Sequence, residues 1–316
     1  AMLNRRSIRI KVLQHIYSFG HNVDLTEDVE GLKTNTLANL KSSISSIDTY
    51  YIQVIVLALN FKEIDFKNKG LKKKNQLNFN LSQNKILDLF QKKSVIKNEI
   101  ISFNSSLASE LELFKDWYKL LKNETFFEIY NKQDSPSVDD DIKFVKDLIF
   151  VFILKNEDIN SFFESRNIHW DIDKQIIRSM LKKSIGSLNS SDFNTFAVAS
   201  LSENINEDIE FASSLFECVV SNTDKYDSYV KKFVKNWDID RISKMDLSII
   251  RLGIAEMTSF NHIPVKVTIN ECIDLAKNFS SPKSGKFVNG LLDVISLNLQ
   301  EIGQIKKTGK GLIDNK

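Results

Sequence analysis

The sequence has few of the residues that interrupt regular structure, with 3 prolines and 10 glycines among 316 residues. Sheet-rich folds need frequent tight turns, and glycine and proline make most of them. Their scarcity argues against a sheet-rich fold and favours long helices. Hydrophobic residues make up 42% and charged residues 27%, an ordinary globular composition for one large domain or two of usual size.

Cysteine, excess charge and long apolar runs are also lacking. Cys218 and Cys272 lie far apart and form no C-x-x-C pair, which excludes a dense disulfide scaffold and indicates a reducing compartment. The 43 basic and 41 acidic residues nearly cancel, so any nucleic-acid surface must be local. No uninterrupted apolar run reaches the ~20 residues that cross a bilayer, and none follows the N-terminal arginines as a secretion signal. We therefore expect a cytoplasmic protein without membrane contact.

Reactive side chains do not form any known catalytic pattern. The four histidines include no H-x-x-x-H or H-E-x-x-H pair, and neither G-x-S-x-G nor G-x-G-x-x-G occurs. Ser284-Gly285-Lys286 resembles the end of a phosphate loop, but Ser280 stands where that loop needs its first glycine. The sequence therefore favours a protein with no enzyme activity, metal site or cofactor.

Hydrophobic residues recur at helical spacing along most of the chain. Ile8, Val12, Ile16 and Phe19 form one stripe and predict a first helix over residues 4–19. Thr268 with Glu271 matches the S/T-x-x-E capping box and predicts a helix start. The fold class is therefore predicted to be all-α. Further helices are expected at about 35–65, 86–121, 140–155, 173–188, 207–221, 225–237, 246–260 and 268–278, and from Pro282 to about 300.

Two separated blocks resemble the NusB family of transcription antitermination factors. The first is Arg5–Phe19, RRSIRIKVLQHIYSF. The second runs from Trp237 and contains PVKVTINE at Pro264–Glu271 and KFVNG at Lys286–Gly290, in the family's order and spacing. The resemblance covers about residues 5–19 and 205–300 and leaves about 185 residues between them unexplained. It implies a pair of helical bundles, the N-terminal one enlarged by inserted long helices, with domains at 1–204 and 205–316.

The resemblance also implies a function. Family members pair with the NusE-type small-subunit ribosomal protein, hold single-stranded boxA-like RNA and support ribosomal RNA transcription. Arg5, Arg6 and Arg9 would contact phosphates or bases, and Tyr17 would stack on a base. From the residues alone, a solvated basic helix face with Tyr17 in the core is the commoner explanation. The resemblance reverses that preference.

A second group of candidate RNA-binding residues lies near the predicted start of the last helix. Lys283, Lys286 and Asn289 lie where free backbone N–H groups and the helix dipole attract phosphate. Phe287 matches the family phenylalanine, for which proximity to RNA and a core position are about equally expected. Asn289 could equally serve packing.

Other polar residues have simpler expected roles. Arg251 and Glu256 are expected to make interhelical polar contacts, and Glu271 to cap its helix. The basic stretch at 67–74 is expected to be a solvated loop rather than a second RNA contact.

Two alternatives remain open at this stage. One is a protein scaffold of NusB-like fold that has lost RNA binding. The other is an accessory domain of an RNA-modifying system, although no Rossmann-type pattern follows Asp293.

Overall fold

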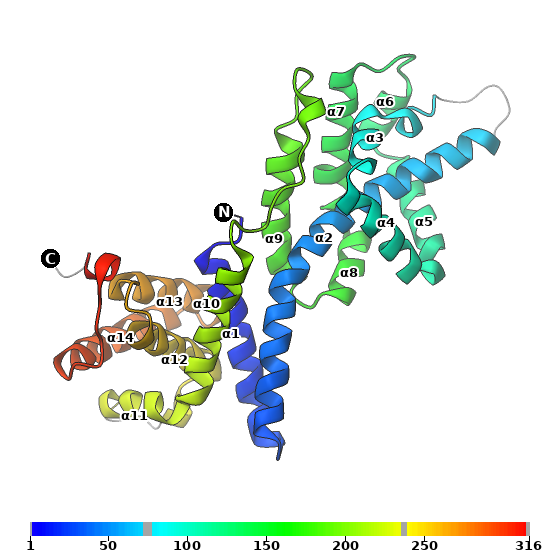
Figure 1. Ribbon diagram of the computed structural model, residues 1–316. Coiled ribbons are helices and arrows are strands. Elements are labelled where there is room, and N and C mark those ends of the chain that lie inside the picture. The colour runs from blue at the N-terminus through cyan, green and yellow to red at the C-terminus, as the bar shows by residue number, and fades with distance from the viewer. Residues whose placement is uncertain (1, 72–77, 235–238, 314–316) are drawn as a thin grey trace. The chain divides into compact units, whose positions relative to one another are not determined.

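The computed structural model describes residues 2–71, 78–234 and 239–313 (Figure 1). These residues form fourteen α-helices joined by short 3-10 and π segments and contain no strand, so the all-α prediction is confirmed. Part of the basic stretch expected as a loop, Lys67–Leu71, instead continues helix α2. Residues 72–74 of that stretch, and Trp237 of the second family-like block, lie outside the described residues.

The chain divides into two compact units. One unit comprises Ala1–Met2 and Ser45–Glu203, and the other joins Leu3–Ile44 to Asn204–Lys316. We call them the insert unit and the terminal unit. The expected domains, 1–204 and 205–316, differ from these units at residues 3–44 and at residue 204. The difference has a physical reason: the apolar stripe of the first helix is buried against helices α10 and α12 of the C-terminal region.

The insert unit is built on the second part of α2 (Val29–Leu71). Tyr51, Val54 and Phe61 of this helix are fully buried, and the apolar residues between them are buried on every face. A helix that is apolar all round belongs inside a core or a membrane. By length and composition α2 could span a bilayer, with a mean hydropathy of 1.3 over its most apolar window, but 61% of that window is buried inside the protein.

Shorter helices surround α2 in the insert unit, and aromatic rings fill the space between them. Phe163 stacks on Trp170 with ring centroids 4.5 Å apart, and Tyr130 stacks on Phe144 at 4.2 Å. The helices are α3 (Lys85–Gln91), α4 (Ser94–Ser106), α5 (Leu111–Leu121), α6 (Thr125–Asn131), α7 (Val138–Asp147), α8 (Glu157–Arg166) and α9 (Trp170–Leu181).

The terminal unit combines the first helix with the last five. Helix α1 (Arg5–Asn22) packs against α10 and α12, and Phe19 meets Phe216 edge-on with ring centroids 6.2 Å apart. Helices α12, α13 and α14 pack on one another. The last five helices are α10 (Ile205–Ser221), α11 (Thr223–Phe233), α12 (Lys244–Ser259), α13 (Val265–Phe279) and α14 (Ser284–Glu301).

Two predicted helix starts in the terminal unit are corrected. Helix α13 begins at Val265 after Pro264, so Thr268 lies inside the helix and the expected capping box is not formed. The Thr268 hydroxyl instead donates to Glu256 at 2.7 Å. Helix α14 begins at Ser284, two residues after Pro282, because the Ser281 and Ser284 hydroxyls bond each other at 2.8 Å and hold the preceding turn.

Candidate nucleic-acid interface

Helix α1 presents three arginines in its first two turns. The helix begins at Arg5 because the side chain of Asn4 accepts a hydrogen bond from the Ser7 backbone N–H at 2.8 Å. Ile8 then points into the core with no exposed surface. Since residues along a helix are separated by about 100°, Arg5 and Arg6 diverge and Arg9 lies between them, one turn further on. The shortest ion pair of each arginine is with a different carboxylate.

Arg9 lies inside the terminal unit, with only 4% of its side chain exposed. Its Nε and one terminal nitrogen donate to the two carboxylate oxygens of Glu256 at 2.7 and 2.8 Å. Glu256 is fully buried, and Thr268 donates to the same carboxylate. The sequence suggested Arg9 as an RNA contact, but its position leaves almost no surface for a phosphate. Its observed role is to neutralise a buried glutamate, and the expected interhelical contact of Glu256 is confirmed.

Arg6 points toward α13 and remains accessible. Its guanidinium donates to both Glu271 oxygens at 2.9 and 3.0 Å and lies 2.9 Å from an Asp274 oxygen. The hydrogen bond and negative charge of Glu271 raise the pKa of Arg6 above its ordinary value. Because 55% of the Arg6 side chain is exposed, its ion pairs are open to solvent and to other anions.

Arg5 points toward the start of α10. One terminal nitrogen lies 3.4 Å from Glu207, and the guanidinium carbon sits 4.1 Å above the Phe211 ring centroid. About 37% of the side chain is exposed. Arg5 and Arg6 therefore face different neighbouring helices rather than a common point.

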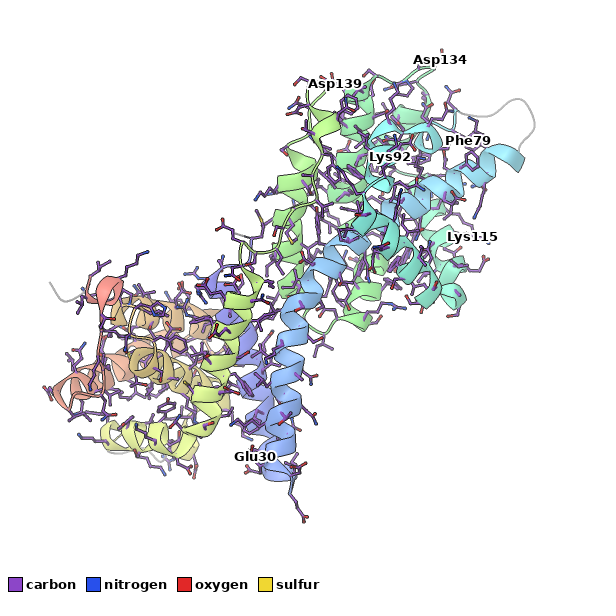
Figure 2. All side chains as sticks on the ribbon, in the orientation of Figure 1. Glu30, Phe79, Lys92, Lys115, Asp134 and Asp139 are labelled. Atoms are coloured by element: carbon purple, nitrogen blue, oxygen red, sulfur yellow. The ribbon has the colours of Figure 1, made fainter. Side chains whose placement is uncertain are left out.

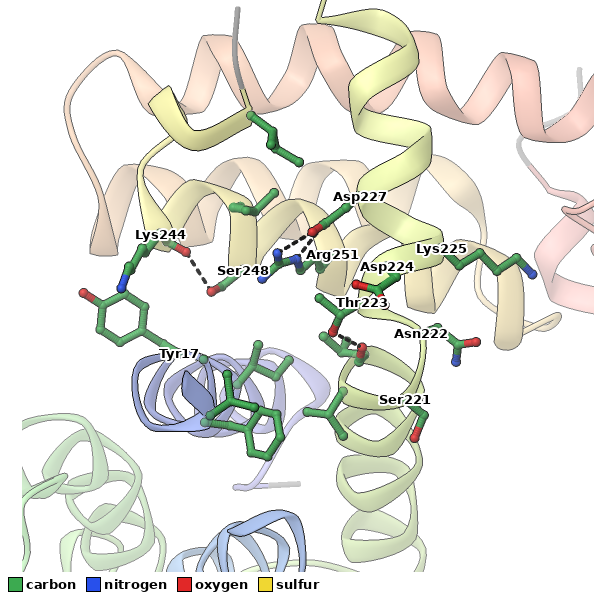
Figure 3. Close-up of a pocket in the computed structure, with 18 of the residues that line it drawn as sticks. Tyr17, Ser221, Asn222, Thr223, Asp224, Lys225, Asp227, Lys244, Ser248 and Arg251 are labelled. Carbon is green, nitrogen blue, oxygen red and sulfur yellow. Dashed lines mark hydrogen bonds and ion pairs between the residues drawn. The ribbon is translucent and has the colours of Figure 1, made fainter. Parts of the chain in front are cut away.

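Tyr17 lines a cleft of about 930 Å³ between the end of α1, the α10–α11 junction and the start of α12 (Figure 3). It is half-buried, so its ring is neither core nor fully exposed. Lys244 of α12 lines the same cleft and is exposed. On the cleft's other side, Arg251 pairs with Asp227 at 2.7 and 2.8 Å, which confirms the interhelical contact expected for Arg251.

The start of α14 carries the second group of candidates. Lys283 and Lys286 are exposed, while Phe287 and Asn289 are half-buried, consistent with either packing or contact. Gly285 lies directly against Lys277 of α13, because a Cβ on Gly285 would come 3.1 Å from the lysine side chain.

The first turn of α12 lies next to both groups of candidates. Its Asp246 accepts a hydrogen bond from Ser284 of α14 at 3.0 Å, while its neighbour Lys244 lines the Tyr17 cleft. Arg6 contacts Asp274, one turn before Lys277 on α13. The start of α12 thus touches both the Tyr17 cleft and the start of α14, whereas Arg6 pairs with α13.

Sequence reasoning missed the acidic partners of the arginines. Glu271 was expected to cap a helix, and Asp274 and Glu207 were not singled out. Their only sequence signal is helical spacing, because residues 271 and 274 lie one turn apart on one face. In the part of the chain that the structure describes, no three His, Cys, Asp or Glu side chains are grouped to hold a metal ion.

Comparison with known proteins places the terminal unit in a family. The sequence model of a protein family, described as "NusB family", matches residues 187–296. These residues include α10 to α13 and most of α14 but not α1. No solved structure was found to match the chain.

Several relatives carry the name transcription antitermination protein NusB. Those from Salinibacter ruber and Natranaerobius thermophilus are 40% and 49% identical, over 33% and 26% of this chain. The chain spans 65% and 58% of the length of these two relatives. The relative from Dictyoglomus thermophilum is 33% identical over 141 residues, which are 45% of this chain and 90% of that protein. The chain therefore belongs to the NusB family.

Proposed function

We propose that the protein is a cytoplasmic transcription antitermination factor that binds single-stranded RNA together with a protein partner and has no catalytic activity of its own. The observation that carries the proposal is the packing of α1 into the family-like unit. Through Arg6 and Arg9, α1 forms ion pairs with α12 and α13, so the basic helix and the family-matching helices form one surface. The names of the relatives support the same role.

The proposed RNA surface consists of Arg6, Tyr17, Lys283 and Lys286, with Phe287 and Asn289 beside the lysines. Exposed ion pairs contribute little stability, about 0–1 kcal/mol, so an RNA phosphate can replace a carboxylate at Arg6 at small cost. Tyr17 offers a half-buried ring in a cleft wide enough for a base. Arg5, paired with Glu207 on the α10 side, would contact RNA only at the edge of this surface. Arg9 would act indirectly, by fixing α1 on α12.

The proposal also specifies which RNA and which protein bind this chain. The RNA is a boxA-like element, the partner is a NusE-type ribosomal protein, and the complex supports ribosomal RNA transcription. In such a complex the protein partner and the RNA would contact each other, and each would also contact this chain. The RNA is therefore expected to bind the chain plus partner more tightly than either protein alone.

Fluorescence anisotropy with a labelled boxA-like RNA tests the proposal. The affinity is measured across salt concentrations, with and without the NusE-type protein. Arg6→Ala is expected to weaken binding and to reduce the slope of log K against log salt by about one unit. Arg166→Ala is the matched control, because Arg166 is also partly exposed and paired with a glutamate, Glu110 at 2.9 Å, but lies in the insert unit. Equal slopes for wild type, Arg6→Ala and Lys286→Ala would remove these residues from the RNA site.

A protein scaffold without RNA binding is the second candidate. It is favoured by one observation: Arg5, Arg6 and Arg9 all have carboxylate partners within the terminal unit. If the chain binds the NusE-type protein but the RNA affinity of that complex equals that of the partner alone, the scaffold function is correct.

A further inference from the structure

The insert unit contains a groove that no family property explains. It lies between α5 and α8, has a volume of about 670 Å³ and is open along one side. It lies inside Ser45–Glu203 and ends before the residues that match the family. Its walls are Leu113, Trp117 and Leu120 from α5, with the charged pair Asp116 and Lys119 beside them, and Asp158, Ser161 and Phe162 from α8.

The α5 residues that line the groove are spaced so that they form one apolar face of the helix, and part of this face is left uncovered. Leu113, Trp117 and Leu120 follow one another by four and three residues, which places them on one stripe. Trp117 is 1% exposed, whereas 40% of Leu120 remains exposed. The core-facing residues of α5, Phe114 and Leu121, are buried on the adjoining face. Helix α5 therefore has more apolar surface than its own unit covers.

The floor of the groove is a fixed aromatic cluster. Trp117 meets Phe162 edge-on with ring centroids 5.2 Å apart and lies 5.5 Å from Phe114. Phe114 in turn stacks on Phe103 at 5.9 Å. Side chains that are already ordered lose little conformational entropy when a partner binds. The groove is thus formed before any occupant arrives.

The Trp117 indole N–H has no hydrogen-bond acceptor among the residues that the structure describes. The nitrogen is buried and makes no hydrogen bond with any described residue. Trp170 of the same unit shows the usual arrangement, because its indole nitrogen donates to Asn160 at 3.0 Å. A buried donor without an acceptor is rare and unfavourable in folded proteins.

The charges around the groove favour a basic occupant. On α5 the neighbouring charges cancel, because Lys119 pairs with Asp116 at 2.8 Å and Lys115, which points outward in Figure 2, pairs with Glu112. On α8, three exposed carboxylates have no ion-pair partner among the described residues, and Arg166 at the helix end is already paired with Glu110. These carboxylates belong to Glu157, Asp158 and Glu164; Asp158 lines the groove, and the other two lie on the same helix outside it.

We propose that the α5–α8 groove is a docking site for an amphipathic helix of a partner protein, with apolar residues on one face and lysines or arginines beside them. The apolar face would cover Leu113, Trp117 and Leu120, and the basic residues would lie along α8. This mode of recognition places residues i, i+3 or i+4, and i+7 of the partner into the groove. The site gives the insert unit a protein-binding role separate from the proposed RNA surface.

Two synthetic helical peptides test the proposal on the full chain. Both carry leucines at positions i, i+4 and i+7, and they differ only in flanking lysines or flanking glutamates. Fluorescence anisotropy is expected to show at least tenfold tighter binding of the lysine peptide at low salt. Equal affinities, or no binding of either peptide at millimolar concentration, would overturn the proposal.

Two pairs of variants locate the binding. Leu120→Lys is expected to weaken binding of the lysine peptide tenfold or more, whereas Leu111→Lys, on the same helix and 47% exposed but outside the groove, leaves it unchanged. Asp158→Lys in the first turn of α8 is expected to reverse the preference between the peptides. Asp139→Lys, in the first turn of α7, is its matched control. Equal effects of a variant and its control would place the peptide elsewhere.

The indole resonance of Trp117 reports the contact directly. It is assigned in a ¹⁵N–¹H spectrum with Trp117→Phe. The lysine peptide is expected to shift it, because the Trp117 ring lines the groove, while the Trp170 resonance stays in place. Light scattering tests whether the occupant of the groove is instead a second copy of the chain. If wild type dimerises and Leu120→Lys is monomeric, the groove is a self-association site and the proposal is overturned.

Discussion

The buried Arg9–Glu256 pair offers the sharpest test of how α1 is held in the terminal unit. Replacing Arg9 by methionine keeps an unbranched apolar stem and removes the guanidinium with its charge. Glu256, with no exposed surface, would keep its hydrogen bond from Thr268 and lose its ion-pair partner. The next guanidinium contact in this network, from Arg9 itself to Glu271 at 3.8 Å, disappears with the same substitution.

The expected loss follows from the burial of both partners. Removing one member of a buried ion pair costs about 3–5 kcal/mol, because the remaining charge is left without compensation. Arg9→Met should therefore lower the free energy of unfolding of the terminal unit by about that amount. Arg5→Met is the control on the same helix. It breaks an exposed pair, so its cost should stay below about 1 kcal/mol. The double variant Arg9→Met/Glu256→Leu should recover most of the loss, since it leaves no buried charge.

Urea unfolding of the full chain, followed by far-UV circular dichroism, measures these differences. Amide hydrogen exchange in α12 and α13 then assigns them to the terminal unit rather than to the insert unit. If Arg9→Met costs no more than Arg5→Met, or if the double variant is as unstable as the single one, the pair does not hold α1 in place and the reasoning fails.

Three further perturbations concern the terminal unit. Gly311→Ala should detach the chain around residue 311, which follows α14, because a Cβ there would overlap the Asn261 carbonyl oxygen. Limited trypsin digestion should then remove this C-terminal segment faster than in wild type. Equal digestion rates would contradict this. Arg251→Ala should cost about 1–3 kcal/mol in urea unfolding by leaving the half-buried Asp227 unpaired. Burial lowers the pKa of Lys307 to about 8, so above that pH the unfolded chain binds the proton more tightly than the folded one. The stability of wild type relative to Lys307→Met should therefore rise between pH 8 and about 10, and a difference that is flat with pH would contradict the shift.

Much of the fold could be predicted from the sequence because its signals are local. The stripe Ile8, Val12, Ile16 and Phe19 predicts both the first helix and its buried face, and all four residues are buried. Scarce glycine and proline predicted an all-α chain, and the motifs near its end indicated the family. The periodicity of a helix can be recognised from residues that are close together in the sequence.

The tertiary structure alone decided which candidate residues remain available to a ligand. Arg6 and Arg9 lie one turn apart on one helix, and nothing in their surroundings along the chain distinguishes them. Arg9 is buried because Glu256, 247 positions away, lies beneath it, whereas Arg6 reaches exposed carboxylates on α13. Likewise, Thr268 fits a capping motif by its neighbours but bonds Glu256 across helices. The reason is physical: a charge or hydroxyl takes the best partner in space, and helix packing, not sequence spacing, sets which partner that is.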